Sequence, residues 1–573
     1  MKKLICIIPA LLLLLLSACS LSEQVTDTPE IGGGRFRDYT TAPLSTLNMY
    51  ATSDTVSINL SRLCTLRLYT KLINQSGDGY YYAPDLALSA PVSISGDNTV
   101  WQIPLRRDCR WANGEIITAQ DFVYSMHALL DPDAGHKQAS VLSSSAYAPI
   151  KNAYEYNTGT CSAEDVGIAV ADDYTLTVTC TIPVTADKLM RLFETPYTMV
   201  VYKPLYEASR IETGGSAYGT SAETFMSAGP MILTKWEKDA LCCFDRNPDY
   251  TYADRYFMDG IDVSVVPDSN TATELFLSGQ LDYLSISYSQ WESFEDDPRV
   301  YDFWGNSLQY MFVNLGNPNQ QNLLGDIDFR RALYYGAERT SMSAALGAIP
   351  ATRLVRKAVV GDPATGTAFV ELEGAGDYID DGYTVYDPNI AKEYLDRALE
   401  KRGIDQADME IYYGESATHS RAASEILHAQ YSDLFSGKLK VTLRSVPAAM
   451  QYNLRRYNPD DPTAFDTSIG SITPSADAPH YTFQYYVSSY SPPRFCYSNA
   501  EYDRLYAEAV SESDPLKSAR ICMQLEQILL SDLVIIPLYE LPSKALFSNR
   551  IKLPSDGFIN NFGFGYEFGV ITD

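Results

Sequence analysis

WQIPLR at residues 101–106 opens the stretch that decides the fold, and WANG at 111–114 and TAQDFVY at 118–124 continue it. Apolar residues alternate in the first segment, which predicts a half-buried strand, and Asn-Gly in the second predicts a tight turn. Thr118 and Asp121 have the spacing of a capping box, so a helix should begin there, with the Thr118 hydroxyl accepting from a backbone amide. The three segments therefore predict a strand, a turn and a capped helix in direct succession.

The same mixture of strands and helices continues along the chain. A hairpin is predicted with its turn at Asp172 and Asp173, and residues 261–265 alternate as a further strand. Asp387 precedes Pro388, which is the pattern of a helix N-cap followed by a proline in the first turn. This order of elements predicts an α/β protein and disfavours a β-sandwich.

Composition limits the class of protein. The 573 residues correspond to several structural units at about 150 residues each, and 46% of them are hydrophobic. A hydrophobic share this large excludes intrinsic disorder for most of the chain. The formal net charge of −28 repels phosphate backbones, so nucleic acid is a poor candidate for a partner.

The N-terminus predicts export and a lipid anchor. The apolar run over residues 4–16 follows two lysines and is too short to span about 30 Å of hydrocarbon, which is typical of a signal peptide. It ends in LSAC, which resembles the bacterial lipobox, in which the cysteine carries diacylglycerol. We therefore expect 1–18 to be a lipoprotein signal peptide, Cys19 to be the lipid attachment site and 19–34 to be a linker. The alternative is an ordinary secretory signal with an incidental cysteine.

Eight further cysteines follow Cys19, without a CxxC or zinc-ribbon spacing. We interpret most of them as small buried hydrophobic residues, with a full set of disulfides as the alternative. Cys242 and Cys243 are adjacent and point to opposite faces if they lie on a strand, so they cannot share a metal.

Further segments extend the opening stretch in a fixed order. They are YAPDLA (82–87), GP (229–230), RNPDY (246–250), SGQLD (278–282), DFRRALYYGAER (328–339), NAEYD (499–503) and IPLY (536–539). Together with the opening stretch they resemble the oligopeptide- and dipeptide-binding proteins of ABC importers, and the resemblance runs from about residue 35 to the C-terminus. It implies a two-lobed α/β clamp of the periplasmic-binding-protein kind, with an extra inserted subdomain, that closes on its ligand.

The resemblance also implies a division of the chain. Lobe I would comprise 35–70, 201–308 and 539–573, the inserted subdomain 71–200, and lobe II 309–538. The implied function is that of an extracytoplasmic receptor, anchored to a bacterial cell membrane, that captures peptides or peptide-like solutes and delivers them to a membrane permease. A ligand enclosed between lobes loses its water, so backbone groups or fixed side chains must satisfy its polar atoms. We expect a monomer.

One segment departs from the family pattern. Relatives carry a Trp-x-x-Asp-Tyr-x-Asp-Pro-like stretch whose first aspartate pairs with the α-ammonium of a peptide. Aligned on Pro479, this chain has Ile472 in place of the tryptophan and Ser475 in place of that aspartate. Asp477 could replace the lost carboxylate if the loop is rebuilt, and the alternative is an exposed turn residue. Recognition of a peptide ammonium is therefore in question, since a buried ammonium needs a carboxylate.

Other candidate ligand residues also come from the resemblance. Tyr39, Thr40, Tyr147 and Tyr539 match places from which the family contacts its ligand, whereas plain packing is the alternative for each tyrosine. His480 could bind a metal or heme-like ligand, although a histidine in a loop is more often a surface residue.

Signals for catalysis are absent from the sequence. It contains no Gly-x-Ser-x-Gly, His-Glu-x-x-His or P-loop motif, and no two histidines stand four residues apart as metal ligands. We therefore expect no catalytic residue, no resident metal and no cofactor. Two alternatives remain: a non-peptide ligand such as a nickel chelate, heme or oligosaccharide, or a lipid-anchored hydrolase.

Overall fold

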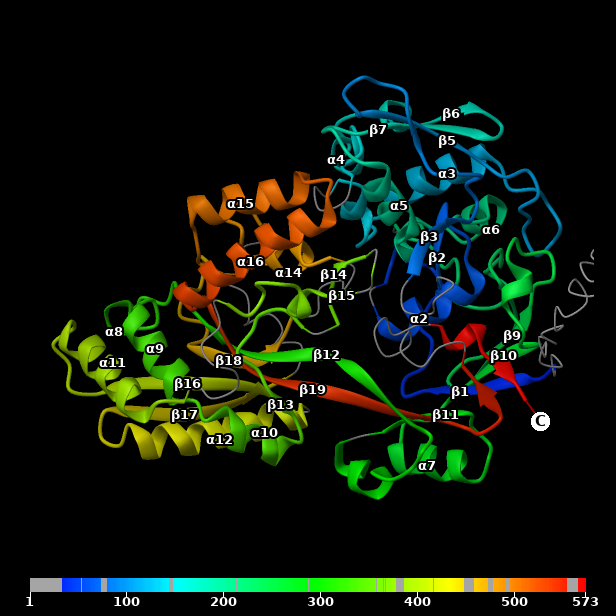
Figure 1. Ribbon diagram of the computed structural model, residues 1–573. Helices are drawn as coiled ribbons and strands as arrows, with labels where there is room; N and C mark the ends of the chain where they lie inside the picture. Colours follow the sequence, from blue (N-terminus) through cyan, green and yellow to red (C-terminus); the bar gives the residue numbers. More distant parts are fainter. Residues whose placement is uncertain are drawn as a thin grey trace, which may run out of the picture.

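The computed structural model is a two-lobed molecule of mixed helices and strands (Figure 1). It describes residues 33–572 without 53, 74–79, 144–147, 213, 287, 357, 364, 366, 378–385, 416, 448–457, 473–477, 491–494 and 554–564. The predicted signal peptide and Cys19 lie outside the described residues. In the part of the chain that is described, no helix has both the length and the apolar character needed to cross a bilayer.

The first lobe is built from both ends of the described chain. Its sheet has the order β1-β10-β9-β8, and β1 lies parallel to β10. Phe36 on β1 stacks on Tyr566 near the C-terminus with ring centroids 5.3 Å apart, so distant segments share one core. The elements of this lobe are β1 (Arg35–Thr40), α2 (Thr55–Cys64), β2 (Tyr69–Ile73), β3 (Tyr80–Pro84), β8 (Met231–Glu237), β9 (Leu241–Arg246), β10 (Gly260–Val265), α7 (Ser269–Leu277), β11 (Tyr283–Ile286), β20 (Ile551–Lys552) and β21 (Val570–Ile571).

A second four-stranded sheet, β4-β5-β7-β6, contains the WQIPLR stretch at 101–106 in its strand β5. Its surroundings comprise β4 (Val92–Ser93), β5 (Val100–Pro104), α3 (Ala119–Leu130), α4 (Ala153–Asn157), β6 (Ile168–Asp172), β7 (Thr175–Thr179), α5 (Ala186–Glu194) and α6 (Lys203–Ala208). The predicted strand, helix and hairpin are confirmed, and Gly114 takes a φ of +88° in the predicted turn. The predicted capping box is present: Asp121 accepts from the Thr118 backbone amide at 2.8 Å, and the Thr118 hydroxyl also donates to the Asp121 carboxylate at 2.8 Å.

The second lobe is a sheet with a separate core on each face. Along β12, Tyr310 packs into the core beneath α15 and α16, whereas its neighbour Met311 packs into the core shared by α9, α11 and α12 (Figure 1). The elements are α8 (Asn319–Asn322), α9 (Ile327–Gly336), α10 (Arg339–Leu346), β13 (Ile349–Pro350), β14 (Val360–Asp362), β15 (Thr367–Ala368), α11 (Pro388–Glu400), β16 (Ala407–Gly414), α12 (Thr418–Leu434), β17 (Leu439–Val446), β18 (Thr467–Ser471), α14 (His480–Phe483), α15 (Ala500–Ser511) and α16 (Pro515–Asp532).

A two-stranded ribbon connects the lobes. β12 (Val300–Val313) and β19 (Ile535–Phe547) are the longest strands of the described chain and pair antiparallel along their length. β11 of the first lobe pairs with one end of β19, and β18 of the second lobe pairs with the far end of β12. The boundaries expected for the second lobe, 308/309 and 538/539, fall within this ribbon, where Gln309 lies opposite Tyr539.

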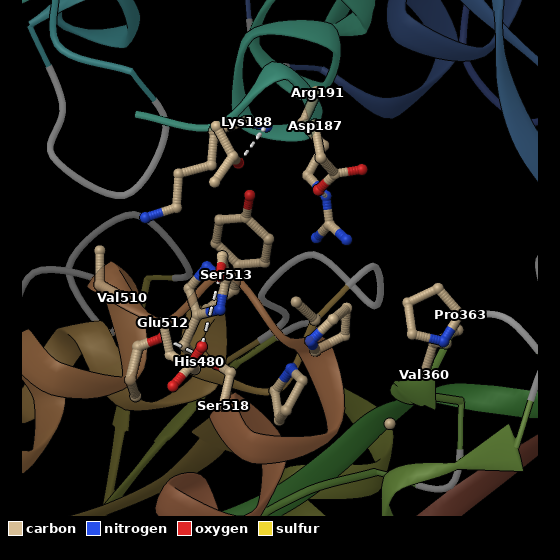
Figure 2. A pocket seen from close by; sticks show the side chains of 17 residues that line it. Asp187, Lys188, Arg191, Val360, Pro363, His480, Val510, Glu512, Ser513 and Ser518 are labelled. Carbon is tan, nitrogen blue, oxygen red and sulfur yellow. Dashed lines mark hydrogen bonds and ion pairs between the residues drawn. The ribbon is translucent and has the colours of Figure 1, made fainter. Parts of the chain in front are cut away.

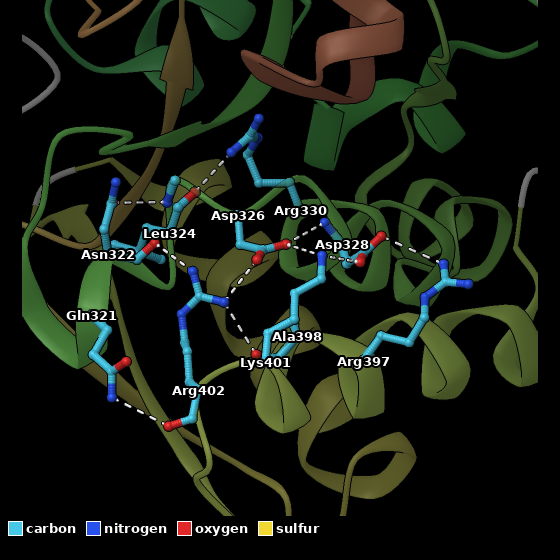
Figure 3. A network of polar contacts seen from close by, with 11 residues as sticks. Gln321, Asn322, Leu324, Asp326, Asp328, Arg330, Arg397, Ala398, Lys401 and Arg402 are labelled. Carbon is cyan, nitrogen blue, oxygen red and sulfur yellow. Dashed lines mark hydrogen bonds and ion pairs between the residues drawn. The ribbon is translucent and has the colours of Figure 1, made fainter.

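Helices α9 and α11 are joined by a network of charged side chains (Figure 3). The Arg402 guanidinium donates to Asp326 at 2.7 Å and also to the Asn322 carbonyl at 3.0 Å. Lys401 donates to Asp328, which lies in the first turn of α9. Asp326 is itself the N-cap of α9, so one carboxylate both starts this helix and ties it to the end of α11.

All eight cysteines after Cys19 are described, and none forms a disulfide. Five of them are buried, which confirms the interpretation of most as small hydrophobic residues. Cys242 is buried on β9 while its neighbour Cys243 is partly exposed, as expected for adjacent residues of a strand.

Candidate functional site

A cavity lies where α5 meets the second lobe (Figure 2). One wall is the first part of α5 with its N-cap Thr185, and the opposite wall comes from β14, α14 and the connection between α15 and α16. Its volume is about 50 Å³, which is enough for a few water molecules and too small for a peptide. The lobes are thus close together here, and a larger ligand requires them to separate.

The wall contributed by α5 is cationic. Arg191 is 9% exposed and donates to Asp187 at 2.8 Å, while its guanidinium lies over the Tyr82 ring at 5.8 Å. Burial alone would lower the pKa of Arg191, but Tyr82 and Asp187 outweigh that effect and raise it, so the side chain stays charged. Lys188 stands one turn earlier, and burial together with the charge of Arg191 lowers its pKa to about 8.

The wall contributed by the second lobe holds an imidazole and a carboxylate. His480 opens α14, is 7% exposed, and lies against the Tyr481 ring with centroids 4.3 Å apart. Glu512 sits in the α15–α16 connection and accepts from the backbone amide of Asp514 at 2.9 Å, which fixes its direction. A cationic helix of one lobe therefore faces a carboxylate and a histidine of the other, which is a polar setting that suits a polar ligand.

Among the described residues, the cavity wall holds no serine, histidine and carboxylate joined by hydrogen bonds in the order that activates a nucleophile. Within the described ranges, no three His, Cys, Asp or Glu side chains are grouped as ligands for a metal ion.

Of the predicted ligand residues that the structure describes, His480 alone lies in the cavity wall. Tyr39 is 9% exposed and its hydroxyl accepts from the Ser285 amide at 3.3 Å. The Thr40 hydroxyl donates to the Ala42 carbonyl at 2.9 Å. Contact of these two residues with a ligand therefore stays a prediction.

Tyr539 is fully buried in the core of the second lobe, and its hydroxyl donates to the His419 carbonyl at 3.4 Å. A ligand could reach this ring only after the core opens. Its role in this arrangement is packing, and its contact with a ligand also stays a prediction.

Three predicted residues, Tyr147, Ser475 and Asp477, lie outside the described residues. Ala478 and Pro479, which follow Asp477 directly in the sequence, line the cavity. The segment that departs from the family pattern therefore leads directly into the wall of the interlobe cavity.

Sequence reasoning missed Lys188 and Arg191. Their spacing of three residues puts them on one side of α5, and the Thr185 hydroxyl caps this helix by accepting from the Lys188 amide at 3.3 Å. The amphipathic pattern of α5 is visible in its sequence. Nothing in the sequence shows that this side of the helix faces the second lobe.

Comparison with known proteins decides the family. The sequence profile of the bacterial extracellular solute-binding proteins, family 5 middle region, matches residues 82–492, which is well over half of the chain. The chain belongs to this family. The resemblance inferred from the sequence motifs is therefore confirmed, and the family comprises substrate-binding proteins of transporters.

Relatives of this family 5 solute-binding protein cover most of its length. The dipeptide-binding protein DppE of Bacillus subtilis is 24% identical over 489 residues, which is 83% of this chain and 81% of the relative. The probable deoxycholate-binding periplasmic protein YgiS of Escherichia coli is 24% identical over 512 residues, or 85% of each chain. The structure of Listeria monocytogenes OppA bound to peptide superposes with a TM-score of 0.70 at 24% identity, covering 95% of this chain and all of the other. The two-lobed fold is thereby confirmed.

Proposed function

We propose that this chain is the substrate-binding receptor of an ABC importer and that it captures peptides or peptide-like solutes between its two lobes. The observation that carries the proposal is the interlobe cavity, to which α5 and the second lobe contribute opposite charges. Among the described strands, the two-stranded ribbon of β12 and β19 connects the lobes. A ribbon of this kind bends at low cost, so a ligand that binds both walls favours the closed state.

Peptides are favoured over other ligands by the known relatives. The relative from Bacillus subtilis is named for dipeptides, and the Listeria protein of the same fold was solved with a peptide. Charged walls of both signs suit a zwitterionic ligand, since Arg191 can meet a carboxylate and Glu512 an ammonium. Glu512 thus offers a partner for a peptide ammonium even if Ser475 cannot.

Native mass spectrometry of the full chain, purified in detergent without refolding, tests this function. Peptides of varied sequence should be released when the complex is denatured, and peptide addition should reduce the radius of gyration in small-angle scattering. An empty protein that ignores a peptide library but is stabilised by deoxycholate, heme or a nickel chelate would contradict the peptide assignment. A protein that hydrolyses the peptides would contradict the absence of catalysis that we propose.

The lipid anchor is part of the same proposal. Replacement Cys19→Ser should abolish incorporation of labelled fatty acid and release the protein from the membrane, because one thiol carries the lipid. Cys6→Ser is the matched control, since that cysteine lies within the predicted signal peptide and should leave lipidation unchanged.

A further inference from the structure

One wall of the interlobe cavity is held by groups that do not line it. Val360 and Gly361 of β14 form part of this wall, together with Pro363. The chain reaches β14 from β13 through residues 351–359, and β13 pairs with the ribbon strand β19. The position of the wall therefore depends on how this connection between β13 and β14 is fixed.

Glu526 of α16 binds the middle of the connection. Its carboxylate accepts from the Leu354 amide at 2.7 Å, from the Val355 amide at 3.2 Å and from the Arg353 guanidinium at 2.9 Å. The Glu526 side chain is 0% exposed, so solvent does not compete for these donors, and a charged acceptor makes stronger hydrogen bonds than a neutral one. One side chain of α16 thus fixes three successive residues of the connection.

The ribbon holds the same connection. The Tyr310 hydroxyl of β12 donates to the Leu354 carbonyl at 2.8 Å, and the Ala351 amide donates to the Leu538 carbonyl of β19 at 3.1 Å. Leu354 is therefore held by its amide from α16 and by its carbonyl from the ribbon. Glu526 and Tyr310 are both buried in the second lobe, and neither is among the residues that line the cavity.

We propose that Glu526 is a positioning residue for the ligand: by holding residues 353–355 it keeps β14 in place as a wall of the site. Tyr310 supports the same segment from the ribbon. A wall that is fixed before the ligand arrives need not be ordered on binding, so the ligand binds more tightly. This inference rests on the proposed receptor function, because it concerns the same cavity.

The peptide affinity of two variants tests the proposal. Glu526→Gln keeps the size of the side chain but removes its charge, and Tyr310→Phe removes one hydroxyl. The probe is a synthetic copy of the most abundant peptide released from the purified chain. Titration calorimetry of the full chain in detergent should show binding weakened by about tenfold for Glu526→Gln and by about threefold for Tyr310→Phe, since residues outside a site modulate its affinity to this extent.

Asp326→Asn is the matched control. Asp326 is also a largely buried carboxylate of the second lobe and pairs with Arg402, but it caps α9, which packs into the core on the other face of the sheet. Its replacement should lower stability and leave peptide affinity unchanged. Unchanged affinity in both Glu526→Gln and Tyr310→Phe, or a loss of the same size in Asp326→Asn, would overturn the proposal.

Hydrogen exchange followed by mass spectrometry provides a readout that needs no peptide. In Glu526→Gln the amides of residues 351–359 should exchange at least about tenfold faster than in the unmodified chain, whereas those of α9 should not change. Tyr310→Phe, which lacks a single hydroxyl, covers the case in which Glu526→Gln does not fold. Unchanged exchange of this segment would overturn the proposal.

The two proposals fail in different ways. An unmodified chain that binds no peptide would contradict the receptor function and this inference with it. An unmodified chain that binds peptide no better than Glu526→Gln and Tyr310→Phe would contradict the role of Glu526 alone.

Discussion

At the scale of single residues, burial of a carboxylate makes stability depend on pH. Asp38 on β1 is 8% exposed and accepts from the Tyr39 amide at 2.7 Å and from the Tyr566 hydroxyl at 3.4 Å. Burial outweighs these bonds and raises the pKa of Asp38 to about 6. The folded chain therefore binds this proton more tightly than the unfolded chain, and the stability that it contributes below about pH 4 is lost as the pH rises through 6.

The variant Asp38→Asn should remove this dependence. The free energy of unfolding of the variant minus that of the unmodified chain should rise by up to about 3 kcal/mol between pH 4 and pH 7. A shift of two pKa units in Asp38 corresponds to that energy. Urea unfolding at both pH values measures the difference. Asp173→Asn, in the exposed turn of the β6–β7 hairpin, is the control and should show no such change. A parallel pH profile for Asp38→Asn and the unmodified chain would contradict the prediction.

At the scale of elements, the network between α9 and α11 should be worth more than surface ion pairs. The side chains of Arg402 and Asp326 are 11% and 10% exposed, so Arg402→Met leaves a largely buried carboxylate without its nearest cation, with Lys401 remaining at 3.5 Å. We expect a loss of about 3 kcal/mol in the free energy of unfolding of the second lobe. Denaturation followed by circular dichroism measures it.

Arg504 on α15 supplies the comparison. It pairs with Glu501 and Glu508, but its side chain is 57% exposed, so Arg504→Met should cost less than about 1 kcal/mol. Equal losses for the two arginine variants would show that burial does not set the strength of the α9–α11 network.

Elements were predictable from sequence where their signals are local. Asp387 caps α11 by accepting from two backbone amides, and Thr118 and Asp121 meet at the start of α3, because caps depend only on residues a few positions apart. β12 and β19 pair although nearly the whole second lobe lies between them in the sequence, and no local pattern encodes that register. For the same reason α5 was not predicted to face the second lobe, and Lys188 and Arg191 were missed.

At the scale of the whole molecule, closure of the lobes should be linked to a proton on Lys188. Its neighbours in the cavity wall are Asp187, Arg191, His480 and Glu512. Burial and Arg191 lower the pKa of Lys188 to about 8 in this arrangement, whereas separation of the lobes exposes the amine and returns its pKa toward 10.5. Closure therefore releases a proton, and peptide affinity should rise as the pH increases above 8.

Titration calorimetry in two buffers of different ionisation enthalpy measures this release. Between pH 8 and pH 10 the unmodified chain should release more protons on peptide binding than the variant Lys188→Met, and the subtraction removes titration of the peptide itself. Lys238→Met, in the exposed turn after β8, should behave like the unmodified chain. Identical proton release by all three proteins would rule out a role for Lys188 in closure.

The sharing of one core between both ends of the chain has a consequence for biosynthesis. Asp38 and Tyr566, which are hydrogen-bonded, stand 528 positions apart, and β19 must be present before the second lobe can complete its sheet. A ribosome delivers these last segments only at the end of translation, so the nascent protein cannot finish its first lobe while it is being made. The order of synthesis thereby keeps the polypeptide unfinished, and open to passage through a secretion channel, until its final residues emerge.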